Sequence, residues 1–235
     1  MDQRLKRALE EAYRAPSSVG KAAFLRRHRR RELGRWELAA VQMGYIRWWV
    51  WGLSLGLFGV ILWAAAQPHT EGPRCAAALT PFLALLAVTE NGRSRFYRME
   101  ELELACRVPR ASVFLARMLA VGLFHLVLLG ALAPALAVWG AVGIVRAGLY
   151  LLTPYLCTAA LGMELTRRLP GREGLPACGG GAVLVSGLGT LAGYWRPELY
   201  LPESLSLWGL GLAASAFAAG AEIMLSLKER ELQWN

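Results

Sequence analysis

A short charged segment between two apolar runs carries the residue types that could bind a soluble partner. We call residues 96–112, FYRMEELELACRVPRAS, the charged island. If the island is helical, one of its stripes is charged and another is apolar. The two stripes are Glu100, Glu103 and Arg107, and Met99, Leu102 and Cys106. The pattern predicts an amphipathic helix, which could dock on another protein or simply connect two segments along the membrane surface.

Three ionisable residues lie within apolar runs and are candidate polar sites, because charges at membrane depth are expensive. Arg117 and His125 are eight residues apart and would share a helix face two turns apart. Arg117 lies near a membrane boundary, where its stem can reach the headgroups, and Glu222 has a similar depth and could pair with it. His125 lies in the middle of its run, where we expect a hydrogen-bonded structural histidine.

The motifs of enzymes and cofactor sites are missing from this sequence. It has no nucleophile–base set, no HExxH motif and no acidic metal-binding cluster, so we expect neither a catalytic nor a metal site. The four cysteines are far apart and form no CxxC pair, which argues against zinc and disulfides. The glycine run 179–181 follows no expected strand and is not followed by Lys-Ser or Lys-Thr. We therefore expect no cofactor on this chain.

The composition indicates an integral membrane protein. Apolar residues make up 55% of the 235 residues and charged residues only 18%, outside the usual range for soluble domains. The charges are clustered, and they leave apolar runs close to the roughly 20 residues that a helix needs to cross a bilayer. These runs are continuous rather than alternating, which favours helices over a β-barrel.

The expected fold is all-α, with a polytopic domain of six transmembrane helices at 48–227. An amino-terminal region at 1–47 would contain amphipathic helices, of which 36–47 would lie in the headgroup layer, and 228–235 would form a tail. The charged island would hold a cytoplasmic coupling helix, and 164–174 would be a loop. The expected spans are 48–66, 75–89, 113–139, 147–163, 176–195 and 205–227.

The distribution of basic residues predicts the orientation. Of 26 lysines and arginines, twelve precede the first span, five lie in or beside the island, three in 164–174 and two in the tail. The loops of the other side hold three. By the positive-inside rule, both termini and the island are cytoplasmic, in a plasma membrane. The basic run 26–31 then faces anionic lipid, and we expect no binding of nucleic acid.

The layout resembles the membrane subunit, or permease, of ATP-binding-cassette exporters of the drug and polysaccharide class. In that family a connecting helix precedes six spans, and a coupling helix between the second and third spans docks in a separate ATPase subunit. Here 102–104, Leu-Glu-Leu, and 108–110, Val-Pro-Arg, are similar to the family's acidic-leucine stretch and following proline. The connecting helix would be 34–47. Met99-Glu100 replaces the family's glycine-threonine, and 196–203 is shorter than its re-entrant segment.

The resemblance implies a permease subunit that forms half of an export pathway with a second, identical or related permease. The chain has no Walker motif, so ATP and Mg would be bound by the partner ATPase, and this chain would not be an enzyme. The mostly apolar spans favour a lipid-like, peptide or amphiphilic cargo. The alternatives are a membrane-anchored adaptor or regulator, suggested by the basic residues 1–34, and an intramembrane enzyme. The docking residues would be Met99, Glu100, Glu101, Leu102, Glu103, Leu104 and Arg107.

Overall fold

A computed structural model describes residues 35–66, 72–97, 110–169 and 171–232. The chain divides into two units, 1–34 and 35–235, and the described residues all belong to the second. These residues contain no β-strand. Their elements are α3 (Arg35–Tyr45), α4 (Trp48–Ala65), α5 (Gly72–Phe96), α7 (Arg110–Trp139), α8 (Ile144–Arg168), α9 (Gly174–Trp195), η1 (Pro197–Tyr200), η2 (Pro202–Ser204) and α10 (Leu205–Leu232).

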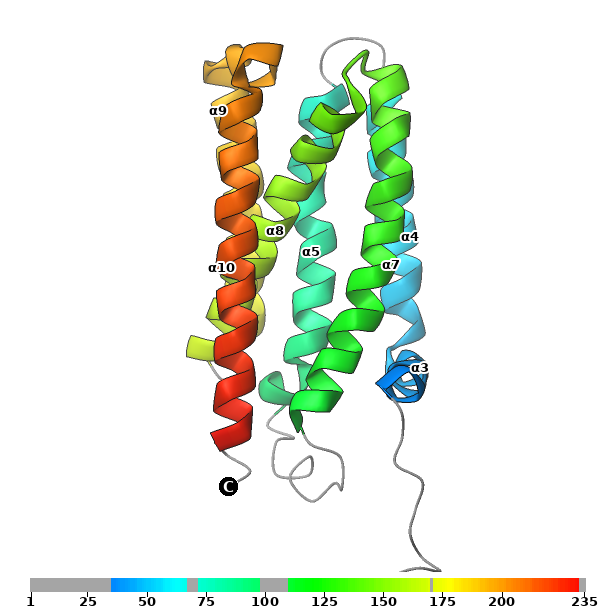
Figure 1. Ribbon diagram of the computed structural model, residues 1–235, viewed down its shortest axis with the longest axis vertical. Helices are drawn as coiled ribbons and strands as arrows, with labels where there is room; N and C mark the ends of the chain where they lie inside the picture. The colour runs from blue at the N-terminus through cyan, green and yellow to red at the C-terminus, as the bar shows by residue number, and fades with distance from the viewer. Residues whose placement is uncertain (1–34, 67–71, 98–109, 170, 233–235) are drawn as a thin grey trace, which may run out of the picture. The chain divides into compact units, whose positions relative to one another are not determined.

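Six helices of the described region are long and apolar enough to cross a membrane, which confirms the predicted all-α polytopic fold. They are α4, α5, α7, α8, α9 and α10, and they alternate in direction (Figure 1). We call the end where α5 stops and α7 begins the island end, and the opposite end, which carries η1 and η2, the cap end. α3 and the last turn of α10 both lie at the island end (Figure 1).

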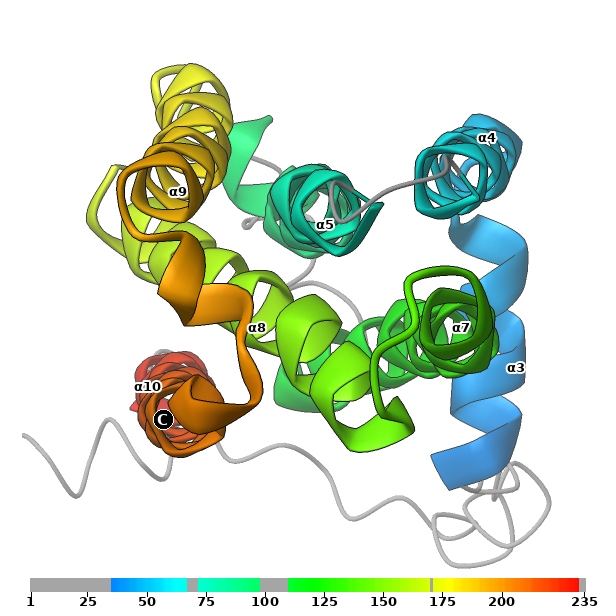
Figure 2. The same cartoon turned by 90° about the horizontal axis from the view of Figure 1, so that it is seen from above.

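The short helix α3 lies across the island end rather than along the bundle, and it packs against α7 (Figure 2). The backbone of Arg47 is extended, which separates α3 from α4. Beside this break, Ile46 is buried together with Val50 and Val121. The other side of α3 exposes Val41 and Tyr45, as expected for a helix that rests in the headgroup layer.

The helix α5 occupies the centre of the bundle, where it contacts α4, α7, α8 and α9 (Figure 2). It is longer at both ends than the expected span 75–89. Pro81 does not interrupt it, and hydroxyl side chains bond to two carbonyls of the turn before the proline. Thr80 donates to the carbonyl of Ala76 at 2.7 Å, and Ser186 of α9 donates to that of Ala78 at 2.6 Å.

The contact between α5 and α8 depends on two glycines. A Cβ atom at Gly162 of α8 would lie 2.8 Å from Cγ1 and 2.9 Å from Cγ2 of Val88. One turn further along α5, a Cβ atom at Gly92 would lie 2.7 Å from Cγ2 of Thr166. Small residues at these points let the two helices approach closely, which is how helices associate in lipid.

Toward the cap end, α4, α5, α7 and α8 share an apolar core. Four of its leucines are fully buried: Leu83 of α5, Leu132 and Leu136 of α7, and Leu151 of α8. Ile61 of α4 is also fully buried there. This half of the bundle is therefore held by direct side-chain packing.

The segment between α9 and α10, expected as a loop or small re-entrant turn, forms η1 and η2 at the cap end. Its carbonyls receive hydrogen bonds from α8 and α10: Tyr150 donates to Tyr200 at 3.1 Å, and Trp208 donates to Leu199 at 2.7 Å. The guanidinium of Arg74 lies 5.5 Å from the centre of the Tyr200 ring. Burial raises the pKa of the Tyr200 phenol to about 12, so this side chain stays neutral at physiological pH.

We predict that Gly162→Ala destabilises the fold by about 1–3 kcal/mol, the usual cost of overpacking. The added methyl would meet both methyls of Val88, so no rotation of that valine relieves the contact. The matched control is Gly148→Ala on the same helix, where a Cβ atom would meet nothing within 4 Å. Unfolding of the purified protein in mixed detergent micelles measures both. Equal effects of the two substitutions would contradict the close α5–α8 contact.

Candidate functional site

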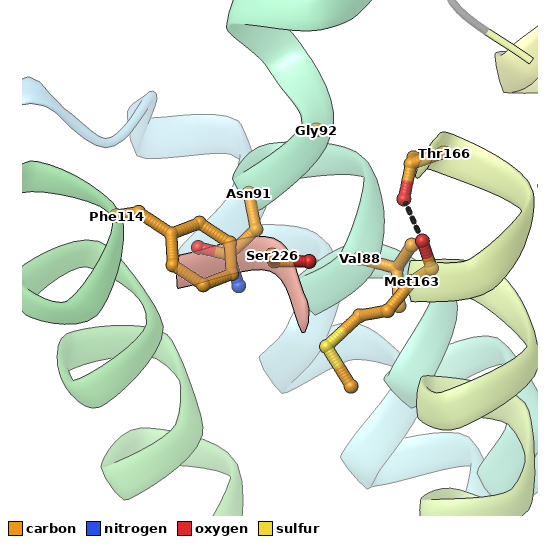
Figure 3. A pocket seen from close by; sticks show the side chains of 7 residues that line it. All are labelled: Val88, Asn91, Gly92, Phe114, Met163, Thr166 and Ser226. Carbon is orange, nitrogen blue, oxygen red and sulfur yellow. Dashed lines mark hydrogen bonds between the residues drawn. The ribbon is translucent and has the colours of Figure 1, made fainter. Parts of the chain in front are cut away.

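Four helices meet at the island end around a small pocket (Figure 3). It lies next to the two helix ends, Phe96 and Arg110, that flank the undescribed part of the charged island. The pocket mixes polar and apolar walls. Its lining residues are Val88, Asn91 and Gly92 of α5, Phe114 of α7, Met163 and Thr166 of α8, and Ser226 of α10.

An ion pair joins α8 to α10 at the same end of the bundle. Arg167 donates to both carboxylate oxygens of Glu222, from Nε at 3.0 Å and from Nη2 at 3.1 Å. The Nη1 atom of Arg167 lies 3.6 Å from Oε1 of Glu229, which follows Glu222 by two turns of α10. Arg167 is 21% and Glu222 13% exposed, so water screens this bidentate pair less than a surface pair.

Arg167 is a site residue that the sequence reasoning missed, because the segment 164–174 is expected to be a loop. That expectation is wrong for its first five residues, since α8 continues to Arg168. The charged residues of the last turn can remain helical because they have partners. Arg168, for example, pairs with Glu164 at 2.6 Å. Because the helix continues through residues 164–168, the side chain of Arg167 faces α10, where it binds Glu222.

The structure also places the third ionisable candidate, Arg117, on α7 at the island end, half-buried and not an unpaired charge. A further acid near this end is Glu90 of α5, which is 4% exposed. Its carboxylate accepts a hydrogen bond at 3.2 Å from Arg93, three residues later on the same helix. The two acids Glu90 and Glu222 at this end thus each accept a hydrogen bond from an arginine.

His125 is fully buried near the middle of α7, and both of its ring nitrogens have partners. Nε2 lies 3.0 Å from the hydroxyl of Ser54 on α4, and Nδ1 lies 3.1 Å from the hydroxyl of Tyr155 on α8. In a neutral imidazole one nitrogen donates and the other accepts, and a hydroxyl can do either. His125 therefore links three helices with hydrogen bonds, and its hydrogen bonding agrees with the expectation from the sequence.

The predicted docking residues Met99, Glu100, Glu101, Leu102, Glu103, Leu104 and Arg107 lie outside the described residues. Of the other predicted site residues, Glu222 is paired with Arg167 of α8. The helix ends on either side of the island, Phe96 and Arg110, lie at the same end of the bundle. His125 lies about three turns of α7 away from Phe114 and forms a separate cluster with Ser54 and Tyr155.

At the island end, the described acids Glu90 and Glu222 are largely buried, and each pairs with an arginine. Among them, no three His, Cys, Asp or Glu side chains are grouped as metal ligands are. No family model, curated protein or solved structure matches the chain. Function must therefore be argued from the residues and their arrangement.

We predict that Arg167→Ala lowers the free energy of unfolding by about 1–3 kcal/mol, because it leaves the largely buried carboxylate of Glu222 without its cation. Exchanging the two charges, Arg167→Glu with Glu222→Arg, should restore most of the loss. Arg168→Ala is the control: its side chain is 67% exposed, so its pair with Glu164 should contribute less than about 1 kcal/mol. If Arg168→Ala lowers the free energy of unfolding as much as Arg167→Ala does, the α8–α10 ion pair does not stabilise the fold more than a surface pair.

A double-mutant cycle tests the hydrogen bond between Ser54 and His125. Ser54→Ala should cost about 1 kcal/mol in the natural sequence and close to nothing when combined with His125→Phe. Ser215→Ala is the control, because Ser215 donates only to the carbonyl of Leu212 on its own helix. Its cost should be the same in both backgrounds. Unfolding free energies supply all the values, and an unchanged cost of Ser54→Ala would contradict the link.

Proposed function

We propose that this chain is the permease subunit of an ATP-driven exporter of the ATP-binding-cassette type. The observation that carries the proposal is the order and placement of its elements. A helix that lies across one end, α3, precedes six helices of membrane length, and the charged island joins the second of them, α5, to the third, α7. This order agrees with the resemblance noted from the island's residues.

The ends of α5 and α7 are suited to receive a force applied to the island. Phe96, the last residue of α5, is buried against Val88 and Cys178, so the end of α5 is fixed to α9. α7 begins at Arg110, directly after Pro109. A partner that moves the island would therefore pull on the first turns of α7 and on the central helix together.

The orientation belongs to the same proposal. The island end would face the cytoplasm of a plasma membrane, because the island, 164–174 and both termini carry most of the lysines and arginines. The ATPase, with its ATP and Mg, would dock there, and a second permease, identical or related, would complete the pathway. Closure of the paired ATPases would then reshape the interface between the permeases.

In this proposal the paired charges at the island end keep the bundle together while the island moves. The Arg167–Glu222 pair makes α8 and α10 move as one body, and the glycine contact holds α8 to α5. The exposed apolar faces of α9 and α10, which include Leu188 and Phe217, would contact lipid or the second permease.

We predict that the tagged wild-type chain copurifies a cassette ATPase from its native membrane. The triple variant Glu100→Ala, Glu101→Ala, Glu103→Ala should lose that ATPase, or lose the coupling of ATP hydrolysis to transport, because the acids would supply the docking contacts. Its thermal unfolding should be unchanged.

The control is Glu198→Ala with Glu203→Ala, two exposed acids at the cap end, which should retain the ATPase. Two results would each count against the proposal: full retention and coupling in the triple variant, or no ATPase with the wild-type chain. Measuring unfolding of each variant in parallel separates lost docking from lost folding.

A further inference from the structure

The last residue of α5, Phe96, places its ring between two glycines of different helices. The side chain is only 6% exposed. A Cβ atom at Gly92, one turn earlier on α5, would lie 3.0 Å from Cε2 and from Cζ of the ring. A Cβ atom at Gly174, the first residue of α9, would lie 2.7 Å from Cε1. Opposite edges of the ring therefore lie against α5 and against α9, and a larger residue at either glycine would displace it.

The next turn of α9 belongs to the same contact. Phe96 is buried together with Val88 of α5 and Cys178 of α9, and Leu165 of α8 packs against this cluster. The Sγ atom of Cys178 lies 3.6 Å from the carbonyl oxygen of Gly162, also on α8. The first two turns of α9 are thus packed against the end of α5, with α8 beside them.

The chain that enters α9 is built to bring its first residue under the ring. Gly171 has φ of 95°, a conformation that glycine adopts readily and other residues rarely do. The N–H of Gly174 donates to the carbonyl of Gly171 at 3.2 Å. A Cβ atom at Gly174 would also lie 2.6 Å from the carbonyl oxygen of Leu169, so only glycine fits at this point without a shift of its neighbours.

The helix α9 has few other buried residues to hold it. Several of its side chains, such as Leu184 and Leu188, are exposed. The buried residues of α9 are Gly174, Cys178, Ala182 and Gly193. The first two of them belong to the contact with Phe96. The position of α9 at the island end therefore depends on where α5 ends.

We propose that the ring of Phe96 joins the end of α5 and the start of α9 into one unit, so that a displacement of the charged island carries α9 with it. Close-packed protein interiors are hardly compressible, so a ring that lies against a glycine on each side passes a displacement on. In the proposed transporter α9 would respond to movement of the island, and that step rests on the proposed function. The link itself belongs to this chain alone and is tested without an ATPase.

Hydrogen–deuterium exchange of the full-length protein in lipid nanodiscs, read by mass spectrometry, tests the link. Phe96→Ala removes the ring. Backbone amides of 178–181 in α9 should then exchange at least about tenfold faster, because losing a buried ring makes local opening easier. Amides of 128–136 in α7, within the apolar core toward the cap end, should be unchanged and report on global unfolding.

Two further variants control for the loss of an aromatic ring and for a folding defect. Tyr97→Ala removes the next ring along the chain, which is 57% exposed, and should leave exchange in α9 unchanged. Phe96→Leu keeps an apolar side chain in the contact. It should accelerate exchange of 178–181 less than Phe96→Ala does and more than Tyr97→Ala does.

Gly174→Ala tests the link from the side of α9. Its new Cβ atom would meet the ring of Phe96, so exchange of 93–96 at the end of α5 should rise several-fold. In the Phe96→Ala background the same substitution should leave α5 unaffected, because no ring remains to pass the displacement on. Unchanged exchange of α9 in Phe96→Ala, or an equal effect of Gly174→Ala on α5 with and without the ring, would overturn the proposal.

Discussion

Lipid offers no hydrogen bonds to a peptide group, and the arrangement of this protein follows from that constraint. Each membrane-length segment is helical. Near Pro81, which has no N–H to donate, the hydroxyls of Thr80 and Ser186 bond to carbonyls of the preceding turn. The same need governs the short helix η1, where Trp208 and Tyr150 donate hydrogen bonds to the carbonyls of Leu199 and Tyr200. Irregular backbone is thus found where other helices can supply donors.

Because apolar side chains gain little from leaving lipid for each other, the contacts between helices must come from close packing and polar bonds. The bundle uses both, at different depths. Leucines fill the space toward the cap end, the pair Gly162 and Gly92 brings α5 and α8 together, and His125 bonds to two neighbouring helices. The Arg167–Glu222 and Arg168–Glu164 ion pairs lie at the island end, where arginine side chains can reach the headgroups.

The number of membrane-length helices and the helix that precedes them could be predicted from the sequence, because long apolar runs separated by charged segments report directly on the length of each span. Helix ends were less predictable: charged residues usually mark a boundary, yet α8 carries Glu164, Arg167 and Arg168 within its last turns because each of these has a partner. The partners of His125 could not be found at all. Ser54 and Tyr155 lie 71 and 30 residues from it in sequence, and only the packing of three helices brings them to it.

The bidentate pair between Arg167 and Glu222 joins residues 55 positions apart, and this spacing matters during synthesis. A chain is made from its amino terminus, so α8 leaves the ribosome while α10 has yet to be translated. Arg167 has no partner from α10 until that helix has been made. The contact between α8 and α10 is therefore completed last, which ties the order of translation to the order of packing.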